Sequence, residues 1–76
     1  MTKEQFIQFV ELRDLINDKV ESIVQWEAYK EGFDFDDVVN LEWYIGRNTI
    51  EITFDVSTGS TCYDHKLELT IDEFCN

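Results

Sequence analysis

The spacing of the apolar residues changes at Gly32, and this change constrains the fold of the chain more than any other feature. Before the glycine, apolar side chains recur every three or four residues from Phe6 onward, as they do along one face of a helix. Thr2 and Gln5 have the spacing of a capping box, and Gly32 is suited to the end of a helix. We therefore expect one helix over roughly residues 3–30. Its apolar stripe comprises Phe6, Phe9, Leu12, Ile16, Val20, Ile23 and Val24.

Two aromatic residues fall outside that stripe. Trp26 and Tyr29 align with Leu15 on the predicted helix. Either the helix has a wide apolar face, or it bends near Asn17 and Asp18. In both cases we expect the two rings to lie in the core or at its edge, where aromatic side chains are usually found.

After Gly32, apolar and polar residues alternate, which is typical of half-buried strands. Turn-forming residues at 46–48 and 57–60 divide this part of the chain into three strands. Thr70 and Glu73 repeat the capping-box spacing and predict a last helical turn that holds Phe74 against the core. The predicted strands cover Phe33 to Ile45, Thr49 to Val56 and Cys62 to Leu69.

Short turns between consecutive strands favour an antiparallel meander with one buried face. Only the N-terminal helix is available to cover that face, and 76 residues are too few for a second core. We predict a single α+β domain over residues 1–76 with two layers. One long N-terminal helix packs on a three-stranded antiparallel meander, in the order α-β-β-β, and a short helical turn ends the chain.

Acidic residues dominate the charge of the chain. There are 17 carboxylates and six basic residues, for a formal net charge of −11, and residues 32–76 hold ten of the acids but two of the bases. Strand alternation places most of these acids on the uncovered side of the sheet, with Tyr44 among them as an aromatic anchor. We predict a partner-binding surface made of Asp34, Asp36, Asp37, Glu42, Tyr44, Glu51, Asp55, Asp64 and Glu68.

The acidic surface has two interpretations. Like charges on neighbouring strands are mildly destabilising, and solubility alone requires less charge than this chain carries. A dedicated partner surface accounts for that excess, because carboxylates on strands have a density of the same order as duplex phosphates. A solvated face on a protein of low pI is the alternative.

The charge also argues against direct binding to nucleic acid or to an anionic membrane. No apolar run approaches the length of a membrane span, and the N-terminus lacks the order of a signal peptide. We therefore expect a cytoplasmic protein.

The few residues able to bind a metal or to act as nucleophiles do not form a recognisable site. Cys62 and Cys75 lack the close spacing of a zinc site, and His65 is the only histidine. Without a secretion signal, we expect both thiols to be reduced. Cys62 and His65 are separated by an odd number of residues, which puts their side chains on opposite faces of a strand. We expect no metal, no cofactor and no enzymatic activity.

In size, charge and order of elements, the whole chain resembles small acidic phage-encoded early proteins. These include anti-restriction and anti-CRISPR inhibitors that mimic nucleic acid. The resemblance implies an inhibitor that presents an acidic surface to a basic, nucleic-acid-binding host protein in the cytoplasm of a bacterial cell. The alternative is a non-enzymatic adaptor or a homodimer that associates through an open edge of the sheet.

Overall fold

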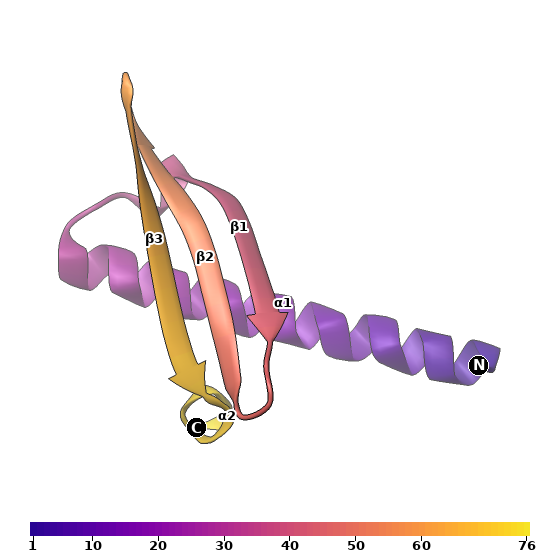
Figure 1. The fold of residues 1–76 in the computed structure, drawn as a ribbon. Coiled ribbons are helices and arrows are strands. Elements are labelled where there is room, and N and C mark those ends of the chain that lie inside the picture. The colour runs from indigo at the N-terminus through magenta and orange to yellow at the C-terminus, as the bar shows by residue number, and fades with distance from the viewer.

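The computed structural model describes all residues, 1–76, and its elements follow the predicted order. A long helix lies behind a three-stranded sheet, and a short helix ends the chain (Figure 1), so the predicted two-layer α+β fold is confirmed. The elements are helix α1 (Lys3–Glu31), the 3₁₀ turn η1 (Phe35–Asp37), strands β1 (Val38–Ile45), β2 (Thr49–Thr58) and β3 (Thr61–Thr70), and helix α2 (Ile71–Cys75). Neither α-helix combines the length and the apolarity that a membrane crossing requires.

Both ends of α1 form as the sequence predicts. The backbone N–H of Gln5 donates to the Thr2 hydroxyl, and the backbone N–H of Thr2 donates to the Gln5 side chain. Gly32 ends the helix in the left-handed region, at φ 85°, and its N–H donates to the carbonyl of Ala28. Glycine adopts this conformation without the steric cost that a β-carbon would bring.

The core lies where the second half of α1 packs on the central strand β2. The three strands are antiparallel in the order β1-β2-β3, and every second residue of β2 is buried against the helix. Val20 and Val24 meet these side chains from α1. The buried residues of β2 are Ile50, Ile52, Phe54 and Val56. The predicted terminal turn is present as α2, capped by Thr70, and it packs Phe74 against this core.

The first strand begins later than predicted. Phe35–Asp37 form η1 instead of a strand, because the Asp34 side chain accepts a hydrogen bond of 3.0 Å from the Asp36 backbone N–H and caps the turn. Aspartate competes in this way with regular backbone pairing. The alternation that begins at Phe33 therefore does not mark a strand up to residue 37.

A bulge in β1 changes which of its valines faces the core. The pairing with β2 is irregular between Val39 and Glu42, and Asn40 has a φ of 56°. A bulge inserts an extra residue and so reverses the side-chain alternation. Val38 packs on the core in consequence, whereas Val39, predicted to face inward, is 41% exposed.

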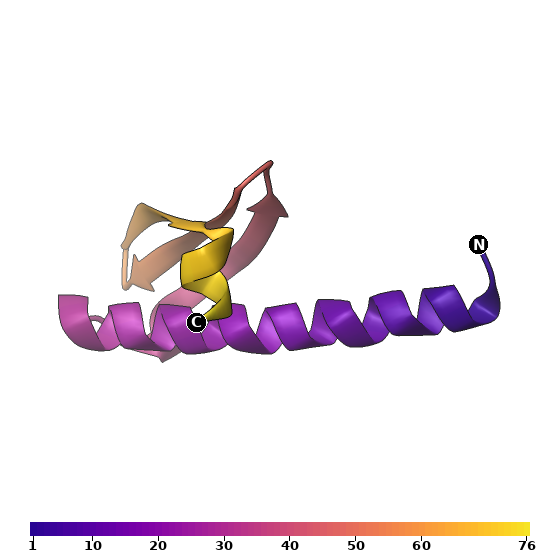
Figure 2. The same ribbon diagram turned by 90° about the horizontal axis from the view of Figure 1, so that it is seen from below.

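Helix α1 is continuous and extends well beyond the sheet (Figure 2). Its 29 residues correspond to about 43 Å. Three strands at about 4.8 Å spacing cannot cover that length when they cross the helix steeply, as Figure 1 shows. The stripe residues Phe6, Phe9 and Leu12 are exposed as a result, whereas Val20 and Val24 of the same stripe are buried.

The aromatic pair on the second half of α1 also lies outside the core. Trp26 and Tyr29 are exposed and stack on each other, with ring centroids 5.7 Å apart. The interpretation that placed them in the core or at its edge is wrong, because the continuous helix buries Val20, Val24 and Ala28 against the sheet, and the two aromatic residues lie outside that buried stripe.

Candidate partner-binding face

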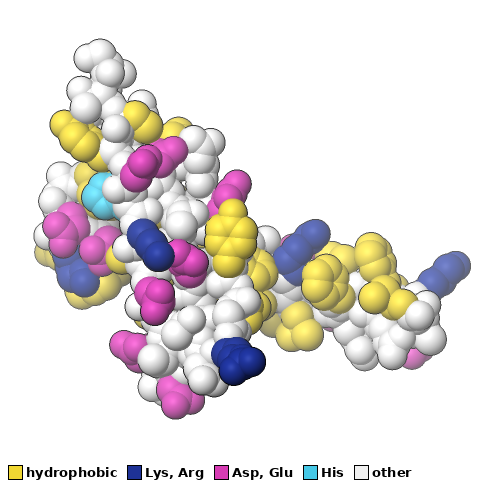
Figure 3. Space-filling model, in the orientation of Figure 1, with side chains coloured by type: hydrophobic (Ala, Val, Ile, Leu, Met, Phe, Trp, Pro, Cys, Tyr) yellow, Lys and Arg dark blue, Asp and Glu magenta, His cyan; other side chains and the backbone are white.

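The side of the sheet opposite α1 is uncovered, and acidic side chains gather on it (Figure 3). Pairing across the strands brings Glu42 opposite Thr53, Glu51 opposite Glu68 and Asp55 opposite Asp64. We call this surface the acidic face, and it consists of Asn40, Glu42, Tyr44, Glu51, Thr53, Asp55, Asp64, Lys66 and Glu68.

The nine predicted site residues divide into two groups. The structure brings Glu42, Tyr44, Glu51, Asp55, Asp64 and Glu68 together on the acidic face. Asp34, Asp36 and Asp37 instead belong to η1 and its N-cap, before β1 begins. They do not share the sheet surface, because the local capping by Asp34 ends the extended conformation that the prediction assumed.

Tyr44 and Glu42 lie side by side on β1, two residues apart on the same face. The Tyr44 phenol is 54% exposed and donates a hydrogen bond to the Glu42 carboxylate. This bond raises the pKa of Tyr44 above its usual value, and the negative charge of Glu42 acts in the same direction. The hydrogen bond therefore orients the ring on the exposed face.

Lys66 is the only basic side chain of the acidic face, and it is paired. Its ammonium lies 2.6 Å from the Glu51 carboxylate. The hydrogen bond to Glu51 and the charge of Glu51 raise the pKa of Lys66, with a smaller contribution from Glu68. Glu68 stands opposite Glu51, is exposed and forms no ion pair of its own.

Two aspartates face each other on β2 and β3. Asn40 Nδ2 donates a 2.9 Å hydrogen bond to Asp55 Oδ2, and Asp64 stands opposite Asp55. The bond from Asn40 lowers the pKa of Asp55, whereas the hydrogen bond with Asp55 and its charge raise the pKa of Asp64. Asp64 therefore binds a proton more readily than Asp55. Asn40 was not among the predicted site residues, although its tolerance of positive φ marks it as a bulge candidate.

The acidic face carries five carboxylates and one ammonium. The ion pair of Glu51 with Lys66 and the hydrogen bonds of Asp55 and Tyr44 hold several of these groups in fixed orientations. The remaining excess of negative charge faces outward on a rigid sheet. Chemically, this arrangement suits electrostatic docking of a basic surface.

The cysteines and the histidine stay apart. His65 lies on the covered side, with its ring stacked on Phe54 at a centroid distance of 5.1 Å. Cys62 and Cys75 are exposed and free. No group of three or more His, Cys, Asp or Glu residues is arranged to hold a metal ion.

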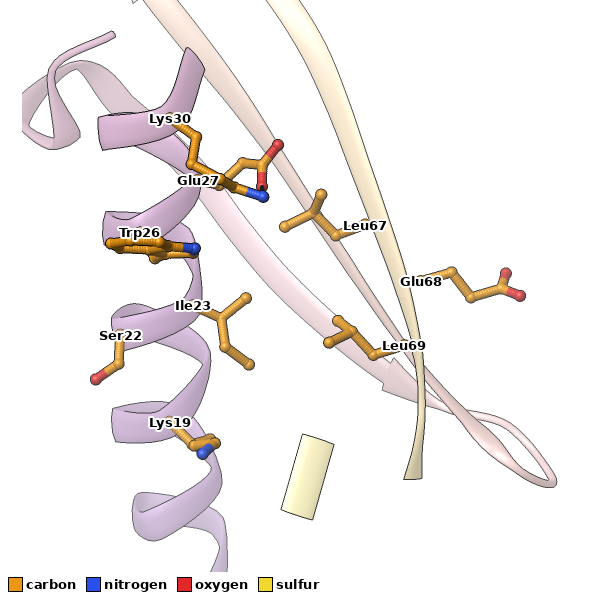
Figure 4. Close-up of a pocket in the computed structure, with 9 residues that line it drawn as sticks. All are labelled: Lys19, Ser22, Ile23, Trp26, Glu27, Lys30, Leu67, Glu68 and Leu69. Atoms are coloured by element: carbon orange, nitrogen blue, oxygen red, sulfur yellow. Dashed lines mark ion pairs between the residues drawn. The ribbon is translucent and has the colours of Figure 1, made fainter. Parts of the chain in front are cut away.

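A groove of about 380 Å³ runs between the second half of α1 and the outer edge of β3 (Figure 4). Ile23 from the helix and Leu67 and Leu69 from the strand point toward one another, whereas Glu68 points away. The exposed Trp26 lines the groove, so an apolar depression lies directly beneath the open edge of β3. The residue spacing did not predict this groove, because Trp26 was expected to lie in the core or at its edge.

Comparisons with models of protein families, with curated proteins and with solved structures match none of them to this chain.

Proposed function

We propose that this protein is an inhibitor that presents its acidic face to a basic groove of a nucleic-acid-binding protein and blocks the groove by occupancy. The resemblance to phage counter-defence inhibitors suggests a host protein in the cytoplasm of a bacterial cell as the target. No chemical step is required, because an occupied groove excludes nucleic acid. The proposed inhibitor is not an enzyme and needs no cofactor.

The observation that carries the proposal is the concentration of carboxylates from all three strands on one uncovered face. Glu42 comes from β1, Glu51 and Asp55 from β2, and Asp64 and Glu68 from β3. Two directly opposed acidic pairs destabilise the sheet by up to about 1 kcal/mol each. A surface that only had to stay in solution would not require this cost.

The sheet that carries the acidic face also favours recognition by charge. The backbone of a paired sheet is already ordered, so association has to order only the side chains that make contact. A net charge of −11 attracts a basic groove over long distances and accelerates encounter at low salt. Tyr44, oriented by Glu42, supplies an aromatic contact of the kind that dominates many interfaces.

The experiment that tests the proposal is affinity capture from a bacterial lysate, followed by a competition assay. A protein retained at low salt and released at high salt is purified and bound to its nucleic acid. Wild-type chain is then expected to displace that nucleic acid. The variant Glu42→Lys with Glu68→Lys should not, because it reverses charge on the two outer strands and leaves the Lys66 ion pair intact.

Asp18→Lys with Glu31→Lys is the matched control. It makes the same change in net charge at exposed positions of α1, away from the acidic face. It should retain most of the competition. Equal loss of activity in both double variants would show that net charge alone matters, and binding that survives high salt would contradict the proposal.

A second candidate is an adaptor or homodimer that associates through the open edge of β3. The groove beneath that edge favours it, since an added strand could pair with β3 and place alternate side chains against Trp26 and Leu67. The edge of β1 is interrupted by its bulge, which weakens it as a template. Trp26→Ala should weaken edge binding but leave charge-driven competition unchanged, so the two functions can be separated.

A further inference from the structure

Strand β3 is an open edge of the sheet, and it is regular over its whole length. The order β1-β2-β3 leaves β3 with a neighbouring strand on one side only (Figure 1). Its pairing with β2 runs from Thr61 to Thr70 without a register shift, whereas β1 carries the bulge at Asn40. Every second residue of such an edge strand turns its backbone N–H and C=O away from the sheet. These groups make β3 able to pair with an added strand.

The two sides of β3 differ in chemistry. Leu67 and Leu69 are half-buried on the side of α1, whereas Asp64, Lys66 and Glu68 are exposed on the acidic face. An added strand has the same alternation of side chains as its neighbour. One set of its side chains therefore meets the groove beneath the edge, and the other set meets the acidic face.

The groove offers an apolar surface to the first set. Ile23 of α1 faces Leu67 and Leu69 across the groove, and Trp26, which is 61% exposed, lines it one turn after Ile23 (Figure 4). The volume of about 380 Å³ falls within the range of ligand sites. Apolar side chains that enter the groove lose contact with water, and this loss favours binding.

The charged side chains at the two ends of the groove already have partners. The Lys30 ammonium lies 3.2 Å from the Glu27 carboxylate. At the other end, the Lys19 ammonium donates a hydrogen bond of 3.3 Å to the backbone carbonyl of Asn76. A charged side chain of an added strand would lose water there without meeting an unpaired opposite charge, which is unfavourable. The groove therefore selects apolar side chains.

The acidic face favours basic side chains in the second set. Asp64 and Glu68 are exposed and form no ion pair, whereas Lys66 between them is paired with Glu51 at 2.6 Å. Side chains directly opposite each other on neighbouring strands lie about 5 Å apart, close enough for opposite charges to attract. Basic residues therefore suit the positions opposite Asp64 and Glu68, and an uncharged polar residue suits the position opposite Lys66.

We propose that the edge of β3 binds an extended segment of a partner protein in which apolar residues alternate with basic and polar ones. Two basic residues, four positions apart, lie opposite Asp64 and Glu68, with an uncharged polar residue between them opposite Lys66. The apolar residues enter the groove toward Leu67 and Trp26. This inference rests on the second candidate function, an adaptor at the edge of β3, and gives its partner a chemistry.

A second copy of this chain fits the edge less well than a basic segment. Each copy has a net charge of −11, and pairing at the edge would bring two acidic sheets side by side. Like charges repel at that distance, whereas the same field attracts a basic segment. The charge of the chain therefore favours a partner of opposite charge over self-association.

The capped peptide Val-Lys-Val-Thr-Val-Lys-Val has the proposed order of side chains and serves as the probe. Isothermal titration calorimetry with the wild-type chain should show saturable one-to-one binding. Replacing both lysines of the peptide by glutamate should weaken binding at least about 10-fold, because two attractive pairs become repulsive. Absence of binding, or equal binding of the glutamate peptide, would overturn the proposal.

Pairing with the backbone of β3 is tested by N-methylation of the peptide. One version is methylated on the lysines and the threonine, and the other on the valines between them. Only one of these alternate sets turns its N–H groups toward β3. One methylated peptide should therefore bind at least about 10-fold more weakly, and the other should bind like the original. Equal binding of the two would overturn pairing at the edge.

Trp26→Ala tests the groove. It removes an exposed wall of the groove and should weaken peptide binding about 10-fold or more. Phe9→Ala is the matched control, because Phe9 is 57% exposed on the same helix but does not line the groove. Circular dichroism verifies that both variants fold. Equal peptide binding by the two variants would overturn the role of the groove.

The competition assay separates this inference from the proposed inhibition. A wild-type chain that displaces nucleic acid but does not bind the peptide would overturn the edge proposal alone. A chain that binds the peptide but does not displace nucleic acid would overturn the inhibition alone. Peptide binding that weakens as the protein concentration rises, together with dimers in sedimentation equilibrium, would show that a second copy occupies the edge and would overturn the basic segment as its occupant.

Discussion

The indole N–H of Trp43 on β1 donates a hydrogen bond of 2.6 Å to the side-chain oxygen of Asn17 on α1. It is the one hydrogen bond between side chains that joins the helix to the sheet, and it is partly buried. Because Asn17 lies near the middle of α1, this bond helps to hold the sheet on the second half of the helix, and residues 3–15 lie outside it.

Removal of the acceptor should destabilise the fold. Asn17→Ala leaves the indole N–H of Trp43 without its partner in a partly buried place, and we expect a loss of about 1–2 kcal/mol in the free energy of unfolding. Urea denaturation measures it. Combining Asn17→Ala with Trp43→Phe should cost less than the sum of the single changes, and strict additivity would contradict a direct coupling.

The core is small enough for one truncation to unfold it. Phe54 is almost fully buried and touches the rings of Phe33 and His65. Phe54→Ala should cost about 3–5 kcal/mol, which is comparable to the whole stability of a domain this size. We expect a largely unfolded chain in far-UV circular dichroism. Tyr63→Ala, at an exposed position, serves as the control and should remain folded.

Salt should stabilise this protein. Its net charge of −11 and the opposed carboxylates on the acidic face repel one another, and ions screen that repulsion. The melting temperature should rise as sodium chloride is added. Glu42→Lys with Glu68→Lys replaces two acids by two bases and should reduce this rise. A melting temperature that is flat or falls with salt would argue against self-repulsion.

The pair Asp55 and Asp64 should make stability depend on pH in a defined direction. Because the pKa of Asp64 is raised, its protonated form stabilises the folded state. This contribution to the free energy of unfolding is lost as the pH rises through that pKa. The lowered pKa of Asp55 acts oppositely, and its contribution is lost as the pH falls through that pKa. Removing the charge of Asp64 should therefore help the fold most at neutral pH.

Asp64→Asn is the variant that tests this pair. Its melting temperature should exceed that of the wild type at neutral pH, because Asp55 no longer faces an ionised neighbour. The difference should shrink in acid, where Asp64 of the wild type takes up its proton. Asp36→Asn removes the same charge from η1 and should lack this pattern. An equal gain at every pH would contradict the assignment.

The regular parts of this fold follow from local patterns. Capping residues and Gly32 define both ends of α1, and the alternation in β2 correctly predicts which of its residues are buried. The errors lie where local hydrogen bonds override the pattern. Asp34 caps η1 and delays β1, and the bulge at Asn40 turns Val39 outward. The spacing of apolar residues does not predict the late start of β1 or the outward position of Val39, because both arise from polar side chains.

The sequence alone determined the helix, the three strands, the antiparallel meander and the side of the sheet on which most carboxylates lie. These features depend on residue spacing and turn chemistry, which act over a few neighbours. Only the tertiary structure decided how far α1 is covered, that Lys66 pairs with Glu51, and that a groove opens beside Trp26. The reason is geometric. An apolar stripe shows which face of a helix can be buried, but the width of the sheet and the angle at which its strands cross the helix decide how much of that stripe is covered.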